Sequence, residues 1–271
     1  MTTTGLEVTL HQGRERAEVT QFTQTLEEIV RALREIDHVY LQRATRATWV
    51  MASLTNESDN LIARLEVRRT PAKRELSDFI VPVEALVNGA RTLQAVPSVP
   101  RLFSPTTVSR MGDLASPRNG VQTVSLAAYN GSVGEAVALT DSVRENAKAA
   151  LDPYQISYGS ITGRVIGMKE LSRTKKVRLT VRAEPTQTIV FADAPERLVE
   201  LVRTSWRHRM LLGGKVRRNA SGQAIRMDVD ALERMPEDDS GRPSTEILLG
   251  VGQSWFPDAS VDDAIDRMRR E

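Results

Sequence analysis

Basic side chains recur at every second position in one short segment of the chain. Lys176, Arg178 and Arg182 lie within the stretch Lys175–Ala183, where apolar and polar residues alternate. Because successive side chains of a β-strand point to opposite faces, these three cations are expected on one face of a sheet. Guanidinium and ammonium groups attract phosphate, so the spacing predicts a surface for a polyanion such as single-stranded DNA or RNA.

We call Lys176, Arg178 and Arg182 the basic stripe. Further cations are expected beside this stripe, in or near two neighbouring loops of the same region. They are Arg173, Lys175, Arg217, Arg218 and Arg226. Together with the stripe they predict a basic groove whose affinity for nucleic acid falls as salt rises. The alternative that the pattern leaves open is an ordinary solvated face of a sheet.

Aromatic residues are the weak point of a nucleic-acid hypothesis. Proteins that bind single strands stack bases on aromatic rings, and each stacked base contributes roughly 1–3 kcal/mol. Only 4% of the chain is aromatic, and this region offers Tyr158, Phe191 and Trp206. Phe191 and Trp206 are expected to lie in the core, whereas the position of Tyr158 is left open.

No constellation of residues predicts catalysis. His11, His38 and His208 lie in three separate segments without the spacing of a metal site, and the chain has no cysteine. The stretch Gly213-Gly214-Lys215 resembles the end of a phosphate-binding loop but lacks the hydroxyl residue that should follow the lysine. Glu237-Asp238-Asp239 is typical of a solvated loop. A non-enzymatic protein without cofactor or metal is therefore expected.

The cations lie in a region that predicts five strands and one helix. The strands are expected at Tyr158–Lys169, Lys175–Ala183, Gln187–Ala192, His208–Arg218 and Ala224–Leu232. A helix over Glu196–Trp206, capped by Asp193, separates the third strand from the fourth. This order is that of an OB-fold, a small five-stranded barrel that binds ligands on strands two and three and in the adjoining loops.

The first 153 residues predict a separate α+β domain. Helices are expected over Glu15–Ile36, Pro82–Ala95, Ser104–Leu114 and Ser142–Leu151, and hairpins over Thr48–Thr55 with Leu61–Arg69 and over Val121–Ala128 with Glu135–Leu139. Ser142 and Glu145 have the spacing of a capping box for the last helix. Asp152-Pro153 then marks the end of the domain.

Charge differs along the chain and supports a division into three parts. Residues 154–235 hold sixteen Lys and Arg against eight Asp and Glu, a net charge of +8, whereas residues 236–271 carry −5 and residues 1–153 carry −1. We therefore expect an α+β domain over 1–153, a basic OB-like barrel over 154–235, and an acidic tail with a short helix over 236–271. The tail could equally fold back and cover the basic barrel.

Composition indicates a cytoplasmic protein. No apolar run reaches the roughly 18–20 residues of a membrane span, and the N-terminus MTTTGLEV has no signal-peptide pattern. The absence of cysteine agrees with that compartment but does not establish it. Thirty-one arginines against six lysines are typical of a GC-rich bacterial genome.

Three segments carry a resemblance to known proteins. The stretches 158–164 (YGSITGR), 213–218 (GGKVRR) continuing to Gly222, and 257–265 (PDASVDDAI) resemble an uncharacterised family of bacterial proteins. The resemblance implies a variable α+β half, an OB-like half and a short C-terminal helix. It implies no activity, because its motifs are structural glycines and strand patterns.

A protein-interaction module is the rival interpretation. Trp255-Phe256 lies in the acidic tail, and aromatic residues flanked by acids often dock into a groove of a partner or of the same chain. Nucleic-acid binding should weaken steeply with salt and with loss of Arg178. A protein interface should depend on Trp255 and Phe256 and change little with moderate salt. Between these two binding roles, the basic face slightly favours nucleic acid.

Overall fold

The structure is a computed structural model that describes residues 4–13, 16–41, 47–68, 76–171, 174 and 176–236. Residues up to Arg234 belong to one compact unit, so the N-terminal half and the strands that follow it are described together. Helices and two β-sheets make up this unit, as the mixed α+β prediction required. Apart from Pro236, the predicted acidic tail with Trp255 and Phe256 lies outside the described residues.

The N-terminal half contains a five-stranded antiparallel sheet with the order β2-β3-β1-β4-β5. Its strands are β1 (Thr4–Gln12), β2 (Trp49–Glu57), β3 (Asn60–Val67), β4 (Val121–Asn130) and β5 (Val137–Leu139). The two predicted hairpins are confirmed. The central strand β1 was not predicted, although Leu6, Val8 and Leu10 alternate with polar residues and are fully buried.

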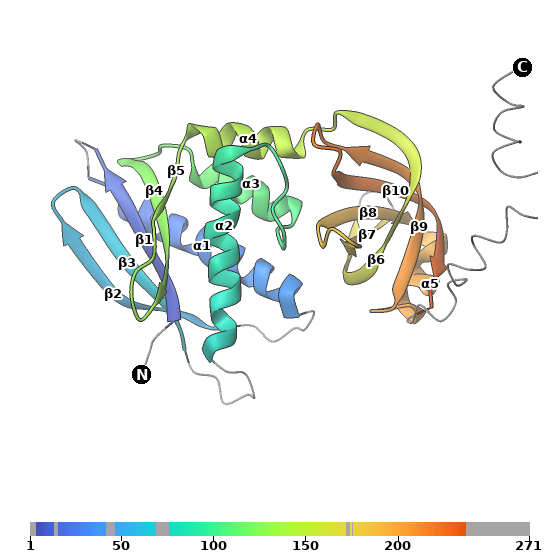
Figure 1. The fold of residues 1–271 in the computed structure, drawn as a ribbon, viewed down its shortest axis with the longest axis horizontal. Coiled ribbons are helices and arrows are strands. Elements are labelled where there is room, and N and C mark those ends of the chain that lie inside the picture. Colours follow the sequence, from blue (N-terminus) through green and yellow to red (C-terminus); the bar gives the residue numbers. More distant parts are fainter. Residues whose placement is uncertain are drawn as a thin grey trace, which may run out of the picture. The chain divides into compact units, whose positions relative to one another are not determined.

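Four helices accompany this sheet (Figure 1). They are α1 (Val19–Leu41), α2 (Ile80–Ala95, after the short 3₁₀ turn η1 at Leu76–Phe79), α3 (Pro105–Leu114) and α4 (Asp141–Leu151). Ser104 caps α3 as predicted, because its hydroxyl accepts a hydrogen bond from the Thr107 amide. The capping box expected at Ser142 is wrong: α4 begins after Thr140, and no side chain caps it.

The other face of the sheet is polar. Arg64 on β3 donates to Glu7 on β1 at 2.8 Å, and its guanidinium lies 5.1 Å from the centre of the Tyr129 ring. His11 makes side-chain hydrogen bonds with Asn60 and Ser125 at 2.8 and 2.9 Å. An antiparallel sheet with one apolar and one polar face needs helices on one side only, which explains why α1–α4 share one core with this sheet.

The second sheet contains β6 (Gln155–Leu171), β7 (Lys176–Ala183), β8 (Ile189–Pro195), β9 (Arg209–Arg218) and β10 (Ala224–Arg234). Its order is β10-β8-β7-β6-β9, and β10 pairs again with β9, so that the sheet closes on itself. All pairs are antiparallel except β8 with β10. We call these five strands the barrel. Their inward side chains form an apolar core that includes Leu179, Met210 and Met227.

The helix predicted between β8 and β9 is confirmed over most of its length: a 3₁₀ turn, η2 (Glu196–Leu198), leads into α5 (Val199–Thr204), which ends two residues before the predicted end at Trp206. The expected cap at Asp193 is wrong, because Asp193 belongs to β8 and is only 3% exposed. Trp206 was expected in the core but is 38% exposed.

The barrel packs directly on the N-terminal half. Ile166, Ile189 and Ile225 are buried barrel residues that belong to the N-terminal core, and Phe191 packs against it. The contact therefore includes the outward side of β8, where Ile189 and Phe191 alternate with the buried barrel residue Val190.

The turn between β9 and β10 joins the same contact. Gln223 accepts from the Val99 amide at 2.7 Å and donates to the Val99 carbonyl at 3.1 Å. Asn219 donates to the Ala150 carbonyl at 3.0 Å, and Ser221 donates to the Pro97 carbonyl at 3.0 Å. The chain turns at Ser221-Gly222, with Gly222 at a φ of +74°. It is held against the N-terminal half by its own polar groups.

Candidate nucleic-acid interface

The predicted basic stripe lies on β7 as expected. Val177, Leu179 and Val181 are buried inside the barrel. The residues that alternate with them are half-buried on the outside: Lys176, Arg178, Thr180 and Arg182. The structure thus brings the three cations to one strand face. What surrounds each of them decides whether its charge is available to a ligand.

Asp193 neutralises the centre of the stripe. Arg178 holds its carboxylate with two hydrogen bonds, from Nε at 2.7 Å and Nη2 at 3.0 Å. Arg226 from β10 donates to the same carboxylate, with Nη2 at 2.5 Å. Burial opposes ionisation of Asp193, but the hydrogen bonds from the two arginines outweigh it and lower its pKa. The hydrogen bond to Asp193 correspondingly raises the pKa of Arg178.

A second carboxylate engages two more of the predicted cations. Asp228 on β10 lies 2.9 Å from Nη2 of Arg217 and 3.7 Å from Nζ of Lys176. The two carboxylates therefore engage four of the predicted cations and balance two of their four positive charges. Sequence reasoning missed both acids, because their proximity to the basic residues follows from strand register and not from sequence spacing.

The other predicted site residues lie elsewhere. Arg173 and Lys175 are outside the described residues. Arg218 donates to the Gly222 carbonyl at 3.1 Å in the β9–β10 turn. Arg182 lines a cavity together with residues of α2 and the segment after it. The predicted residues therefore do not form one continuous open groove.

The N-terminal half occupies part of the face where ligands were expected. Ile189 is buried against the N-terminal core, and Phe191 packs on it beneath the Arg178 guanidinium, 5.6 Å from the ring centre. The turn between β9 and β10 is also taken up by hydrogen bonds to the N-terminal half. An extended ligand on strands β7 and β8 would have to share this surface with the protein's own helices.

A different strip of the barrel is open. Tyr154 is 80% exposed, Ile156 is 51% exposed and Tyr158 is 78% exposed. The three residues alternate along the start of β6, so their side chains share one face. Tyr158 pairs with Lys215 across the strands and Ile156 pairs with Arg217, and the next residue of β9, Val216, points into the barrel core. We call Tyr154, Ile156, Tyr158 and Lys215 the tyrosine strip.

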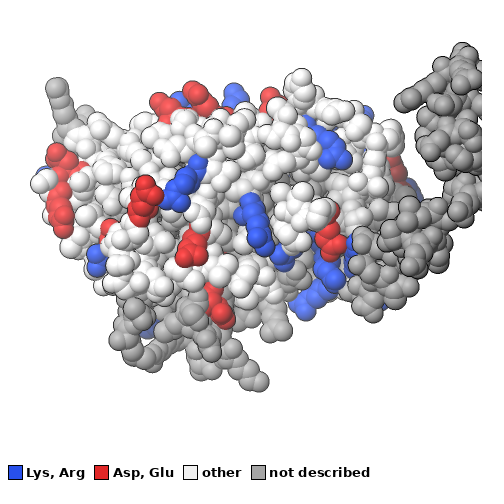
Figure 2. All heavy atoms as spheres, in the orientation of Figure 1, with Lys and Arg blue, Asp and Glu red and all other residues white. Residues whose placement is uncertain are grey.

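Charge on this strip is less neutralised than on β7. Within the described part of the chain, Lys215 is exposed and makes no ion pair, whereas Arg217, which faces the same side beside Ile156, is paired with Asp228. The Tyr154 amide donates to the Arg218 carbonyl at 2.8 Å, which ties the start of the strip to β9. Figure 2 shows Lys and Arg side chains over the barrel, and more Asp and Glu over the N-terminal sheet.

The sequence held a signal for the tyrosine strip. Tyr-x-Ile-x-Tyr at positions 154–158 alternates as clearly as the stripe on β7, but most of it lies before the predicted start of the first barrel strand at Tyr158. The strand in fact begins at Gln155, and this longer first strand places Tyr154 and Ile156 beside Tyr158. The tyrosine strip was therefore missed because the first barrel strand was expected to begin only at Tyr158.

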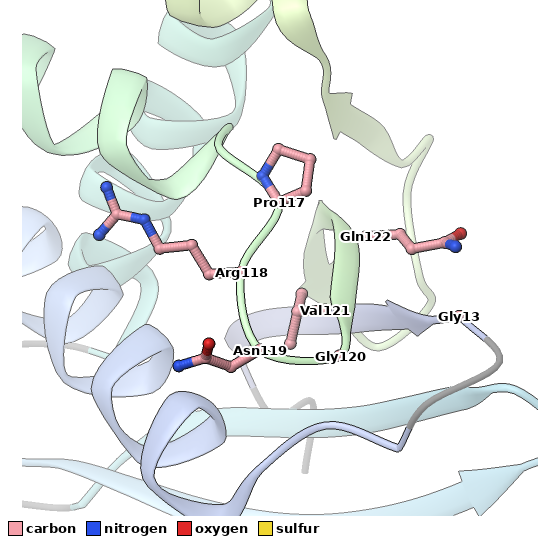
Figure 3. A pocket seen from close by; sticks show the side chains of 7 residues that line it. All are labelled: Gly13, Pro117, Arg118, Asn119, Gly120, Val121 and Gln122. Atoms are coloured by element: carbon pink, nitrogen blue, oxygen red, sulfur yellow. The ribbon is translucent and has the colours of Figure 1, made fainter.

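An open hollow of about 500 Å³ lies at the turn before β4 and is lined by Gly13 and residues 117–122. Figure 3 shows the side chains of Arg118 and Gln122 pointing away from each other rather than into a common centre. Arg118 lies 3.9 Å from Asp113, and the backbone of Asn119 and Gly120 bonds the chain at Glu18 and Gly13. This hollow follows from the shape of the turn and offers no converging polar groups.

Metal binding finds no support in the described residues, where no three His, Cys, Asp or Glu side chains gather as ligands. None of the helices in the described ranges is both long and apolar enough to cross a membrane. No protein-family model matches the chain, and no curated protein sequence matches it significantly. Any functional assignment therefore depends on the geometry of the molecule itself.

Proposed function

We propose that the protein binds single-stranded nucleic acid on the tyrosine strip of an OB-fold. The order of pairing around the barrel supports the OB assignment: the first strand pairs with the second and fourth, and the third runs parallel to the fifth. The fold alone would fit many ligands. The observation that carries the proposal is the pair of exposed tyrosines, Tyr154 directly before β6 and Tyr158 on β6 beside Lys215.

The two rings are spaced for a single strand. Four residues of extended chain separate them, about 13 Å at the rise of a β-strand. A single strand stretched along β6 can place non-adjacent bases on the two rings, with a phosphate toward Lys215. Stacking on both rings contributes roughly 2–6 kcal/mol in total, more than a phosphate contact with one exposed cation provides. Binding should therefore depend more on the rings than on charge.

Fluorescence anisotropy with short labelled single-stranded DNA and RNA, at two salt concentrations, tests the proposal. We expect saturable binding that weakens with salt, weaker binding to duplexes, and a loss of at least about 30-fold in the Tyr154→Ala/Tyr158→Ala double variant. Trp206→Ala is the matched control, because it removes another exposed aromatic ring of the barrel and should leave affinity unchanged. Equal affinity in the double variant and the parent protein would refute the role of the strip.

A protein partner is the second candidate, and Ile156 favours it. The start of β6, Gln155 to Thr162, pairs with β9, whereas the β6 pairing with β7 begins only at Gly163. An extended peptide could add to that free edge with apolar side chains against Ile156. Such binding would change little with salt and would be lost in Ile156→Asp. The roles expected for Trp255 and Phe256 belong to this candidate. The Trp255→Ala/Phe256→Ala variant tests them by its affinity for such a peptide.

A further inference from the structure

A cavity of about 380 Å³ lies between α2 and the barrel strand β7. Its lining comes from four segments of the chain: the end of α1, α2, the segment after α2, and Arg182 on β7. The polar and charged side chains of the lining are those of Tyr40, Glu84, Asn88, Thr92, Arg101 and Arg182. The volume is within the range of cavities that hold small molecules in proteins.

Two guanidinium groups line this cavity, and neither has a protein partner in the described part of the chain. Arg182 makes no hydrogen bond or ion pair there, and its Nε is buried without an acceptor. Arg101 is exposed at the cavity and likewise has no described partner. Arginine carries five N–H donors, so an unpartnered pair leaves many donors directed at the cavity or its edge.

The carboxylate whose charge acts on Arg182 belongs to Glu184, which is already engaged by other arginines. Glu184 accepts from Nε of Arg209 at 2.9 Å and lies 3.8 Å from Arg164. Burial lowers the pKa of Arg182, the charges of Arg101 and Arg164 lower it further, and Glu184 only partly opposes them. A partly buried cation with like charges around it is costly in the free protein, and an anion at this position would remove that cost.

We infer that this cavity is a binding site for a small organic anion, whose phosphate or carboxylate group lies between Arg101 and Arg182. Guanidinium groups bind both anions through paired hydrogen bonds, so the pair explains recognition of the charged end. Tyr40, Val81 and Leu102 give the remainder of the cavity an apolar wall for the organic part. This site is separate from the tyrosine strip and does not depend on nucleic-acid binding.

Isothermal titration of the full-length protein tests the site with four probes at matched ionic strength. AMP and pyrophosphate carry phosphate, citrate carries carboxylates, and adenosine is the neutral counterpart of AMP. We expect saturable binding of at least one anion and none of adenosine. A preference for AMP and pyrophosphate over citrate would assign a phosphate ligand, and the reverse preference a carboxylate ligand. Failure of all three anions to bind at millimolar concentrations would overturn the inference.

Two variants locate the site. Arg101→Ala should weaken binding at least about tenfold without loss of folding, because Arg101 is exposed and unpaired in the described structure. Arg91→Ala is the matched control: Arg91 lies on α2 but pairs with Glu135 outside the cavity, so affinity should not change. Equal loss in both variants, or in neither, would contradict the site.

Arg182→Met separates a ligand-binding role from a structural one. The variant keeps most of the aliphatic stem, so it should lose anion binding while the ligand-free protein melts at the same temperature or a higher one. A lower melting temperature with unchanged anion affinity would show that Arg182 serves the fold only. The Tyr154→Ala/Tyr158→Ala variant should bind the anion as the parent protein does, so the two proposals can fail independently.

Discussion

Two faces of the barrel carry basic side chains at alternate strand positions, yet their surroundings differ. On β7, β8 and β10, Arg178 and Arg226 share Asp193, and Asp228 lies beside Lys176. On β6 and β9, Lys215 pairs across the strands with exposed Tyr158 and makes no ion pair with the described residues. A run of cations therefore indicates a ligand site only if no carboxylate of the fold already neutralises their charge.

The two faces also differ in what covers them. The outward residues of β8 pack against the N-terminal core, whereas the start of β6 projects beyond its pairing with β7. The N-terminal half packs over the part of the first face that β8 provides, whereas the second face remains open to solvent. Stability should therefore depend on the first face and ligand affinity on the second. Each prediction below tests one side of that division.

The largest effect is expected for Asp193→Ala. Removing this carboxylate leaves Arg178 and Arg226 without their shared partner at a nearly buried site, which should lower the free energy of unfolding by about 3 kcal/mol. Urea denaturation followed by circular dichroism measures it. Asp230→Ala is the control, because Asp230 is an exposed acid on the same strand as Arg226 and should change stability by less than about 0.5 kcal/mol. Similar effects of the two variants would remove Asp193 from its structural role.

Protonation of the Asp193 carboxylate at low pH should also destabilise the fold. The pKa of Asp193 is lowered in the folded protein from the ordinary value of 3.8, since the hydrogen bonds of Arg178 and Arg226 outweigh its burial. Its ionisation therefore stabilises the fold above pH 3.8, and that stability is lost as the pH falls toward the lowered pKa. The loss from this one group is at most about 1.4 kcal/mol per pH unit. In Asp193→Asn, unfolding midpoints measured from pH 5 downward should fall less steeply than in the parent protein.

A smaller effect is expected for Lys215→Ala on the open face. Loss of one phosphate contact should reduce the slope of log affinity against log salt by about 0.7 for a single strand. Anisotropy titrations over a salt series measure this slope. Lys169→Ala is a suitable control, because Lys169 is an exposed lysine at the other end of β6. If the slope falls equally in both variants, the interaction is a general attraction to basic protein and not a contact on the tyrosine strip.

Periodicity in the sequence was enough to predict most elements of the fold. The alternation of apolar and polar residues predicted all five barrel strands in their order. Proline after Ser104 predicted the start of α3. Local patterns failed where tertiary contacts decide. Asp193 has the sequence context of a helix cap, but the two arginines on neighbouring strands hold it within β8 instead. Such a choice between two partners cannot be read from adjacent residues.

The candidate sites were harder to predict than the fold. The stripe of Lys176, Arg178 and Arg182 was placed on the correct strand face, but the sequence could not show that Asp193 and Asp228 reach it across the sheet. The cavity at Arg182 also depends on α2, about ninety residues earlier in the chain. Both features arise from strand register and from packing of the barrel on the N-terminal half, which no spacing within one segment encodes.

The smallest effect is expected for Lys176→Ala, which tests the comparison from the opposite side. Its ammonium lies 3.7 Å from Asp228 and is 45% exposed, so the pair should contribute less than about 0.5 kcal/mol to stability. Because Asp228 already balances this charge, nucleic-acid affinity and its salt slope should also remain close to those of the parent protein. Measured beside Lys215→Ala, the variant ranks the two faces directly. A larger loss of affinity in Lys176→Ala would place the ligand on β7, and the paired cations would then be part of the binding surface.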